Sequence, residues 1–167
     1  MADEDLEAAV LSAVEAAGVS YEVMPCDPDL ADTAAFCEHY GVAPAESANT
    51  IVVASKRGER RDVACVVLAT TRLDVNGTVR RLMGVNKASF ASPDETRQLT
   101  GMLVGGVTAA ALPDAVPIYV DSRVMDLPDV VIGGGSRSMK LRVPSELFRR
   151  LPNTTVIDGL AVEAPPA

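Results

Sequence analysis

The chain has 167 residues and a net charge of −8, which argues against a DNA-binding protein because duplex binders usually carry a basic surface. This length fits one domain over residues 1–167, with a disordered tail at 162–167. The composition, with 48% hydrophobic but only 4% aromatic residues, suits a compact α+β fold. No apolar run reaches the roughly 18 to 20 residues of a membrane span, and the acidic N-terminus lacks the basic segment of a signal peptide, so we expect a cytoplasmic protein without a membrane partner.

Two helices and a strand are predicted in the first 41 residues. Apolar residues recur at helical spacing over 3–17, which predicts the first helix, and a short strand follows at 21–24. Asp32 or Thr33 can then cap a second helix, which Gly41 ends.

A hairpin of central strands is predicted next. Two valine-rich runs, 50–54 and 63–69, are joined by a basic, polar turn. A short helix follows over 76–83. Another helix is predicted to begin after Ser92, because Glu95 three residues later completes the signature of a capping box.

The second half of the chain contains mainly strands. These are predicted over 117–120, 130–132 and 139–143, before a helix that opens at Pro144 and a last strand over 155–157. Helices and strands alternate without the regular rhythm of a parallel doubly wound sheet, which favours a mixed sheet with flanking helices.

Few residues offer nucleophilic or metal-binding chemistry. Cys26, Cys37 and Cys65 lack the CxxC spacing of a zinc site, so we expect free, buried thiols. His39 is the only histidine, at the end of a predicted helix, and no GxSxG elbow supports a catalytic triad. We therefore expect no metal and no cofactor.

Basic residues gather in three local groups, each of which is either a solvated surface or a contact for RNA phosphates. The groups are Lys56, Arg57, Arg60 and Arg61; Arg80 and Arg81; and Arg137, Lys140 and Arg142.

Two glycine-rich turns are the most unusual local feature. Gly105 and Gly106 follow a predicted helix, and Gly134 and Gly135 follow a predicted buried strand. Glycine lets a backbone amide approach a ligand closely, so two such turns that meet could form an oxyanion hole. Each turn taken alone is equally consistent with an ordinary tight turn.

The order of several segments resembles one protein family. The segments are NTIVV, RLDVNGTVRRLMGVNKASFASPDETRQLTGMLVGGVT, LPDAVPIYVD and VVIGGGSRSMKLRVP. From about Leu6 to Ala161 the chain resembles the YbaK and prolyl-tRNA-synthetase-associated editing family. The resemblance implies a mixed, barrel-like β-sheet with surrounding helices and a pocket for the aminoacyl-adenosine end of a mischarged tRNA, whose ester bond is hydrolysed.

The resemblance also implies roles for individual residues. As catalytic residues it indicates Asn49, Gly105 and Gly106, and as substrate-binding residues Thr50, Gly134, Gly135 and Arg137. Asn49 stands where the family usually carries a functional lysine, and Lys140 stands where many members carry an acidic residue. Another cation could replace that lysine, and the candidates are Lys87, Arg137 and Lys140.

The leading hypothesis is therefore an aminoacyl-tRNA deacylase whose partner is the tRNA acceptor end, with an aminoacyl-tRNA synthetase as a further candidate partner. One alternative is a binding module for aminoacyl-adenosine or a nucleotide that no longer hydrolyses its ligand, because asparagine lacks the charge of lysine. A purely structural domain is the third hypothesis.

Overall fold

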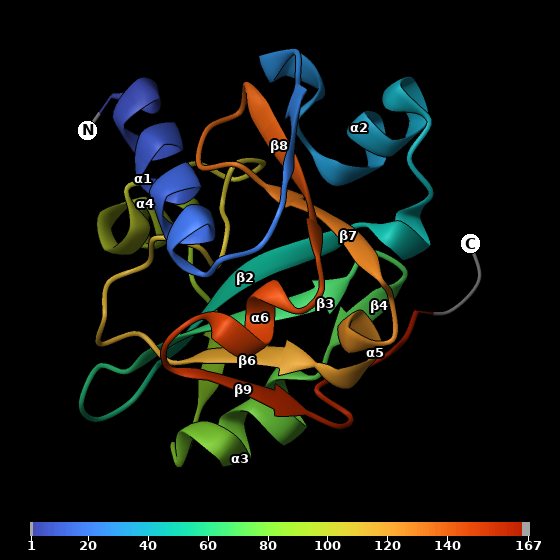
Figure 1. Ribbon diagram of the computed structural model, residues 1–167. Coiled ribbons are helices and arrows are strands. Elements are labelled where there is room, and N and C mark those ends of the chain that lie inside the picture. The colour runs from blue at the N-terminus through green and yellow to red at the C-terminus, as the bar shows by residue number, and fades with distance from the viewer. Residues whose placement is uncertain (1, 165–167) are drawn as a thin grey trace.

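Three β-sheets and their flanking helices make up the computed structural model, which describes residues 2–164 (Figure 1). The strands are β1 (Glu22–Pro25), β2 (Ala48–Ser55), β3 (Asp62–Leu68), β4 (Thr71–Leu73), β5 (Ala88–Phe90), β6 (Ile118–Asp121), β7 (Asp129–Gly133), β8 (Met139–Pro144), β9 (Thr154–Ile157) and β10 (Ala161–Glu163). The α-helices are α1 (Asp3–Ala16), α2 (Thr33–Tyr40), α3 (Arg80–Met83), α4 (Pro93–Thr100), α5 (Ser122–Met125) and α6 (Leu147–Arg150). Short η elements lie at Pro28–Leu30, Pro44–Glu46 and Val75–Val79, the last a π-helical turn.

The largest sheet has the strand order β5-β2-β3-β6-β9. Its centre is the predicted hairpin, in which β2 and β3 are antiparallel, whereas β3, β6 and β9 run parallel. The mixed sheet with flanking helices is thus confirmed. The strands between residues 2 and 164 do not close into one barrel, because β1, β8 and β7 form a separate antiparallel sheet and β10 pairs only with β4.

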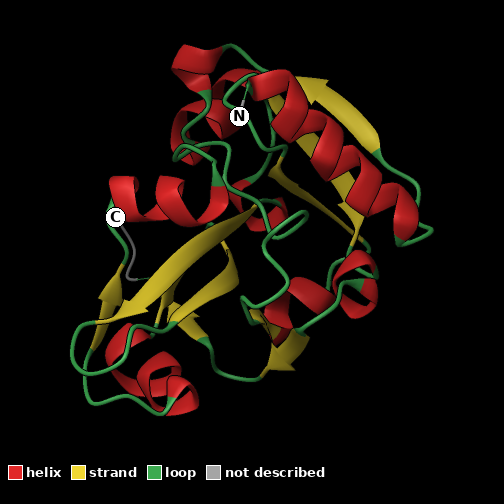
Figure 2. Cartoon of the chain, turned by 90° about the vertical axis from the view of Figure 1, so that its left-hand side faces the viewer, coloured by secondary structure: helices red, strands yellow, loops and turns green. Residues whose placement is uncertain are grey.

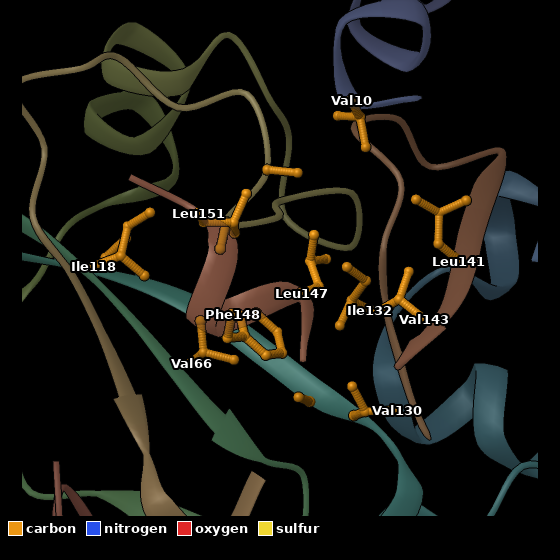
Figure 3. Close-up of a cluster of buried hydrophobic side chains, with 14 of the residues drawn as sticks. Val10, Val66, Ile118, Val130, Ile132, Leu141, Val143, Leu147, Phe148 and Leu151 are labelled. Atoms are coloured by element: carbon orange, nitrogen blue, oxygen red, sulfur yellow. The ribbon is translucent and has the colours of Figure 1, made fainter. Parts of the chain in front are cut away.

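The two larger sheets are joined at one point and pack around a common core. A parallel bridge between Ser47 and Val131 links the start of β2 to β7. Figure 2 shows the strands in two groups, with α1 alongside one of them. Leu147 and Phe148 of α6 are buried in a core cluster that also contains Ile132 and Leu141 (Figure 3). Burial of side chains of this size contributes roughly 1.5 to 3 kcal/mol each.

Local signals in the sequence set several helix ends. Helix α4 begins with the predicted capping box, in which Ser92 accepts from the N–H of Glu95 and Glu95 accepts from the N–H of Ser92. Helix α2 ends at Gly41, which has the left-handed conformation that glycine favours. The longest helix is α1, with 14 residues, and no helix within residues 2–164 is long and apolar enough to span a bilayer.

Two predictions at the C-terminal end are wrong. Pro144 is the last residue of β8, and helix α6 begins three residues later at Leu147, because the strand pairs as far as Asp129 before the chain turns. Val162 and Glu163 lie in β10, where backbone pairing to β4 orders them, so the tail does not begin at 162. Residues 165–167 lie outside the described part.

The capping box also predicts a pH dependence of stability. Hydrogen bonding from the N–H of Ser92, aided by Arg60, lowers the pKa of Glu95 from 4.5 to about 2. Because the pKa is lower in the folded state, the carboxylate stabilises the fold above about pH 4.5, and this contribution declines as the pH falls towards 2. Thermal melts should therefore show a Tm difference between wild type and Glu95→Gln that is largest at pH 6 and shrinks towards pH 2. A constant difference would contradict the assignment.

Candidate active site

A cavity of about 340 Å³ lies along one edge of β2. Its walls come from the start of α2, from β2, from the loop that follows α4, and from the neighbouring strands β7 and β8. The polar lining includes Asp32, Thr33, Ser47, Asn49, Thr50, Thr96 and Lys140, and the apolar lining includes Ile51, Val52, Ala91, Val104, Val107 and Ile132. The size and the mixed lining suit a small organic group with a few polar atoms.

Strand β2 presents unpaired backbone groups to this cavity. The carbonyl of Ser47 accepts from the N–H of Ala69, so Ser47 and every second residue after it hydrogen bond to the β3 side. In an antiparallel ladder the intervening residues direct their peptide groups the other way. On that side β5 pairs with Val53–Ser55, and the carbonyl of Val52 accepts from the N–H of Ala91. The N–H and C=O of Thr50 therefore lie at the edge that lines the cavity.

The side chain of Asn49 is held in place by the start of α2. Its Oδ1 accepts a hydrogen bond of 2.5 Å from the hydroxyl of Thr33, and both residues line the cavity. Asparagine carries two N–H donors besides this acceptor. Asn49 can therefore orient a ligand by a neutral hydrogen bond while its own position is fixed by Thr33.

Gly105 brings backbone into contact with the cavity, and its conformation requires glycine. Its φ of +94° is one that residues with a side chain rarely adopt, and a Cβ atom there would collide with the guanidinium of Arg137. Its carbonyl accepts from Nζ of Lys140 at 2.7 Å. No acceptor within residues 2–164 hydrogen bonds to its N–H, which is therefore free to bind a ligand.

The other predicted glycines connect the two turns to each other. The N–H of Gly135 donates to the carbonyl of Gly106 at 2.9 Å, so the turns do meet in space. The N–H of Gly106 donates to Leu103 and that of Gly134 to Met139. Gly106, Gly134 and Gly135 are buried and none of the three lines the cavity, so these amides are used within the fold. A role for them in catalysis or binding stays a prediction.

Arg137 bridges the two loops at the rim of the cavity. Its Nη1 donates to the carboxylate of Asp32 at 2.9 Å and to the carbonyl of Val104 at 2.6 Å, and its Nε donates to the carbonyl of Pro28 at 3.0 Å. These bonds fix the peptide that precedes Gly105 relative to the start of α2. The structure therefore shows that Arg137 connects these segments by hydrogen bonds. Direct substrate binding by Arg137 stays a prediction.

Lys140 supplies a buried cation to the cavity. Lys140 is only 7% exposed. Its Nζ lies 5.3 Å from the centre of the Phe36 ring and donates a hydrogen bond to the carbonyl of Gly105. Burial lowers the pKa of Lys140, and the nearby Arg137 acts in the same direction. No carboxylate within residues 2–164 lies within 4.0 Å of this ammonium. A buried charge without a partner is costly, so Lys140 is suited to bind an anionic oxygen.

The cysteines remain free and buried, as predicted. Burial raises the pKa of Cys26 and of Cys37, while the positive charge of Lys140 opposes that shift at both thiols. Burial raises the pKa of Cys65 to about 12. Neutral thiols of this kind are poor nucleophiles.

No group of three potential ligands among His, Cys, Asp and Glu is placed to hold a metal ion in the part of the chain that the structure describes. His39 is exposed in the last turn of α2, where the sequence placed it. The polar groups at the cavity that the proposed chemistry can use include hydrogen-bonding groups of Asn49, Thr50 and Gly105 and the charge of Lys140, beside the Asp32 carboxylate and the hydroxyls of Thr33, Ser47 and Thr96.

Sequence reasoning identified three lining residues, Asn49, Thr50 and Gly105, but did not single out Thr33 or Lys140 as part of the site. Lys140 was one of three candidate cations, and only the pairing of β8 with β7 selects it, because this pairing sets Lys140 opposite Gly133 at the cavity wall. Nothing in the local sequence around Thr33 indicates its bond to Asn49, sixteen residues away.

Comparison with protein families places most of the chain in one family model. The sequence model of the aminoacyl-tRNA editing domain matches residues 27–151, which include every residue of the cavity described above.

Solved structures with the same fold cover nearly the whole chain. A protein described as "hypothetical protein APE2540" has a TM-score of 0.79 at 24% identity, covering 91% of this chain and 98% of its own. A protein described as "a putative trans-editing enzyme for prolyl tRNA synthetase" has a TM-score of 0.76 at 25% identity, covering 95% and 97%. A protein described as "a Putative signal transduction protein" from Marinobacter aquaeolei VT8 contains a similar fold in 31% of its length, with a TM-score of 0.63 at 18% identity over 93% of this chain.

Proposed function

The chain belongs to the aminoacyl-tRNA editing domain family, and we propose that it is a deacylase that hydrolyses the ester bond of a mischarged tRNA in the cavity beside β2. The observation that carries this proposal is the combination in one cavity of an amide N–H without an acceptor, at Gly105, and a buried ammonium, at Lys140. Both groups are suited to an ester carbonyl, whose oxygen becomes negative as the bond is attacked.

In this proposal the aminoacyl-adenosine end of the tRNA enters along β2. Thr50 and Asn49 hydrogen bond to the ligand, and the N–H of Gly105 and Nζ of Lys140 stabilise the developing oxyanion. The oxygen of a water molecule forms a bond to the carbonyl carbon, assisted by a hydroxyl of the substrate. The bond from that carbon to the ribose oxygen then breaks, so the amino acid leaves as the free acid and the ribose oxygen takes a proton.

The direct test is a panel of mischarged tRNAs incubated with the purified protein, with release of free amino acid as the readout. We expect turnover of at least one pair well above the rate in buffer. In the cell this activity would belong to the cytoplasm, with the tRNA acceptor end as the partner and an aminoacyl-tRNA synthetase as a further candidate.

A second candidate is a module that binds the aminoacyl-adenosine end without hydrolysing it. It is favoured by Asn49, whose side chain is neutral and accepts a hydrogen bond from the hydroxyl of Thr33. Lys140 weighs against this candidate because it restores a cation to the cavity from another strand. Saturable binding of mischarged tRNA without release of amino acid would select the binding module.

Asn49 is expected to contribute modestly to the rate. A neutral hydrogen bond is worth roughly 1 kcal/mol, so Asn49→Ala should slow deacylation about fivefold. Initial rates at saturating and limiting tRNA would check this value, with Thr33→Val as a matched variant that removes the support of Asn49 but keeps its amide. A loss of more than about 100-fold in Asn49→Ala alone would make Asn49 essential and contradict the orienting role.

A further inference from the structure

Two basic segments that are separate in the sequence come together in the fold. The N–H of Lys56, in the loop between β2 and β3, donates to the carbonyl of Lys87 at 2.9 Å. From the same loop, Nη1 of Arg61 donates to the carbonyl of Met83 in α3 at 3.0 Å. In Figure 1 this loop and α3 lie towards the lower left of the molecule. Their meeting forms a basic patch of seven residues: Lys56, Arg57, Arg60, Arg61, Arg80, Arg81 and Lys87.

This basic patch is an exception on an acidic protein. It holds seven of the fifteen lysines and arginines of a chain whose net charge is −8. Lys56 pairs with Glu95 at 3.4 Å, and Arg60 pairs with both Glu95 at 2.5 Å and Asp62 at 2.8 Å. Arg57, Arg81 and Lys87 are exposed, and no carboxylate between residues 2 and 164 lies within 4.0 Å of them, although the charge of Arg81 contributes to the lowered pKa of Asp74. These three side chains are therefore available to phosphates.

An edge strand connects the basic patch to the cavity. Ala91 lines the cavity, and its N–H donates to the carbonyl of Val52 at 2.9 Å, which extends the pairing of β5 with β2. Lys87 precedes Ala91 by four residues, a distance of about 13 Å along an extended chain. Between them Phe90 is 55% exposed, although the protein has only six aromatic residues. Exposed aromatic rings beside basic residues are typical of surfaces that bind single-stranded nucleic acid.

We propose that this surface binds the RNA strand whose 3′ end enters the cavity: the basic patch contacts its phosphates, and Phe90 stacks on an unpaired base. The inference rests on the proposed function, since it places the remainder of the same tRNA. It also explains how an acidic protein can bind RNA, because the contact is local and must weaken with salt.

The test uses a labelled RNA hairpin with an unpaired 3′ extension, and its affinity is measured by fluorescence anisotropy at several salt concentrations. The variant Arg81→Glu/Lys87→Glu should bind at least about tenfold more weakly, and the log–log salt slope should fall by about 1.4, or about 0.7 for each lost phosphate contact. Phe90→Ala should weaken binding on the order of tenfold and leave the salt slope unchanged.

The matched control is Arg72→Glu/Arg149→Glu, which changes the net charge equally at two exposed positions outside the basic patch. This control should bind as wild type does. Equal weakening by both double variants would reduce the effect to net charge and overturn the inference, as would unchanged affinity in Arg81→Glu/Lys87→Glu. Melting curves verify that each variant is folded.

A second arm separates this inference from the proposed function. Arg81→Glu/Lys87→Glu should lower kcat/KM for a mischarged tRNA about tenfold but leave hydrolysis of an aminoacyl-adenosine, which has no RNA stem, unchanged. If wild type hydrolyses neither substrate, the proposed function fails while the binding measurements still decide the fate of the RNA surface. Wild-type turnover of tRNA that the double variant retains in full would overturn the RNA surface alone.

Discussion

Replacing Gly105 with Val is expected to slow deacylation about 100- to 1000-fold, the usual cost of losing one oxyanion donor. The φ of +94° is unfavourable for any β-branched residue, so the peptide must rotate and the direction of the N–H changes. The new side chain would also collide with Arg137, which braces the adjoining peptide, and would approach Ala31. Single-turnover release of amino acid from a mischarged tRNA measures this effect.

The matched control for this substitution is Gly159→Val. Gly159 has a similar φ of +75°, with open space around the position of a Cβ atom and no contact with the cavity. Both variants should lose stability from the strained backbone, on the order of 1 to 3 kcal/mol, and Gly105→Val should lose more because its side chain also collides with Arg137. Circular dichroism and melting establish that they are folded. A folded Gly105→Val protein with full activity would show that the amide of Gly105 does not hold the oxyanion.

Replacing Lys140 with Met is expected to slow deacylation on the order of 100-fold. Methionine keeps a long side chain against Phe36 but removes the ammonium, which makes a charge-assisted bond to a developing oxyanion. Since the charge matters most in the transition state, kcat should fall more than KM rises. Lys140→Arg keeps the charge with a different shape and should retain more activity than Lys140→Met.

The free energy of unfolding of Lys140→Met should not fall together with its rate of deacylation. This difference separates a functional from a structural role of Lys140. Removing a buried cation that has no carboxylate partner relieves its desolvation, which offsets the lost hydrogen bond to the carbonyl of Gly105, so little change in stability is expected when methionine fills the space. Burial lowers the pKa of Lys140, so the unfolded chain binds more protons than the folded one as the pH approaches 10.5. The stability of wild type should therefore rise relative to Lys140→Met in the alkaline range below pH 10.5. A large loss of stability in Lys140→Met at neutral pH would contradict the functional role.

Local chemistry explains why parts of the fold were predictable. The capping box at Ser92 and Glu95 and the glycine that ends α2 act within a few residues, so the sequence reveals them directly. The hairpin of β2 and β3 follows from two valine-rich runs around a polar turn. By contrast, β4, β5 and β10 have only three residues each, and their existence depends on partners elsewhere in the chain.

The candidate site was harder to predict because distant segments build it. Gly106 and Gly135 look like ligand-binding glycines in the sequence, yet their peptide groups bond to each other where the two turns meet. In the sequence, Lys140 is one of three basic residues near a turn. Only the pairing of β8 with both β1 and β7 buries it beside Gly105. The basic patch likewise exists only because the loop after β2 contacts α3.

The most direct test of the proposed mechanism is the rate of amino acid release from a panel of mischarged tRNAs, measured side by side for wild type, Gly105→Val and Gly159→Val. We expect wild type and Gly159→Val to deacylate at least one tRNA far faster than buffer does, and Gly105→Val to lose about 100-fold or more of that rate. Saturable binding of every tRNA by wild type without release of amino acid, or equal rates for all three folded proteins, would contradict hydrolysis at this cavity.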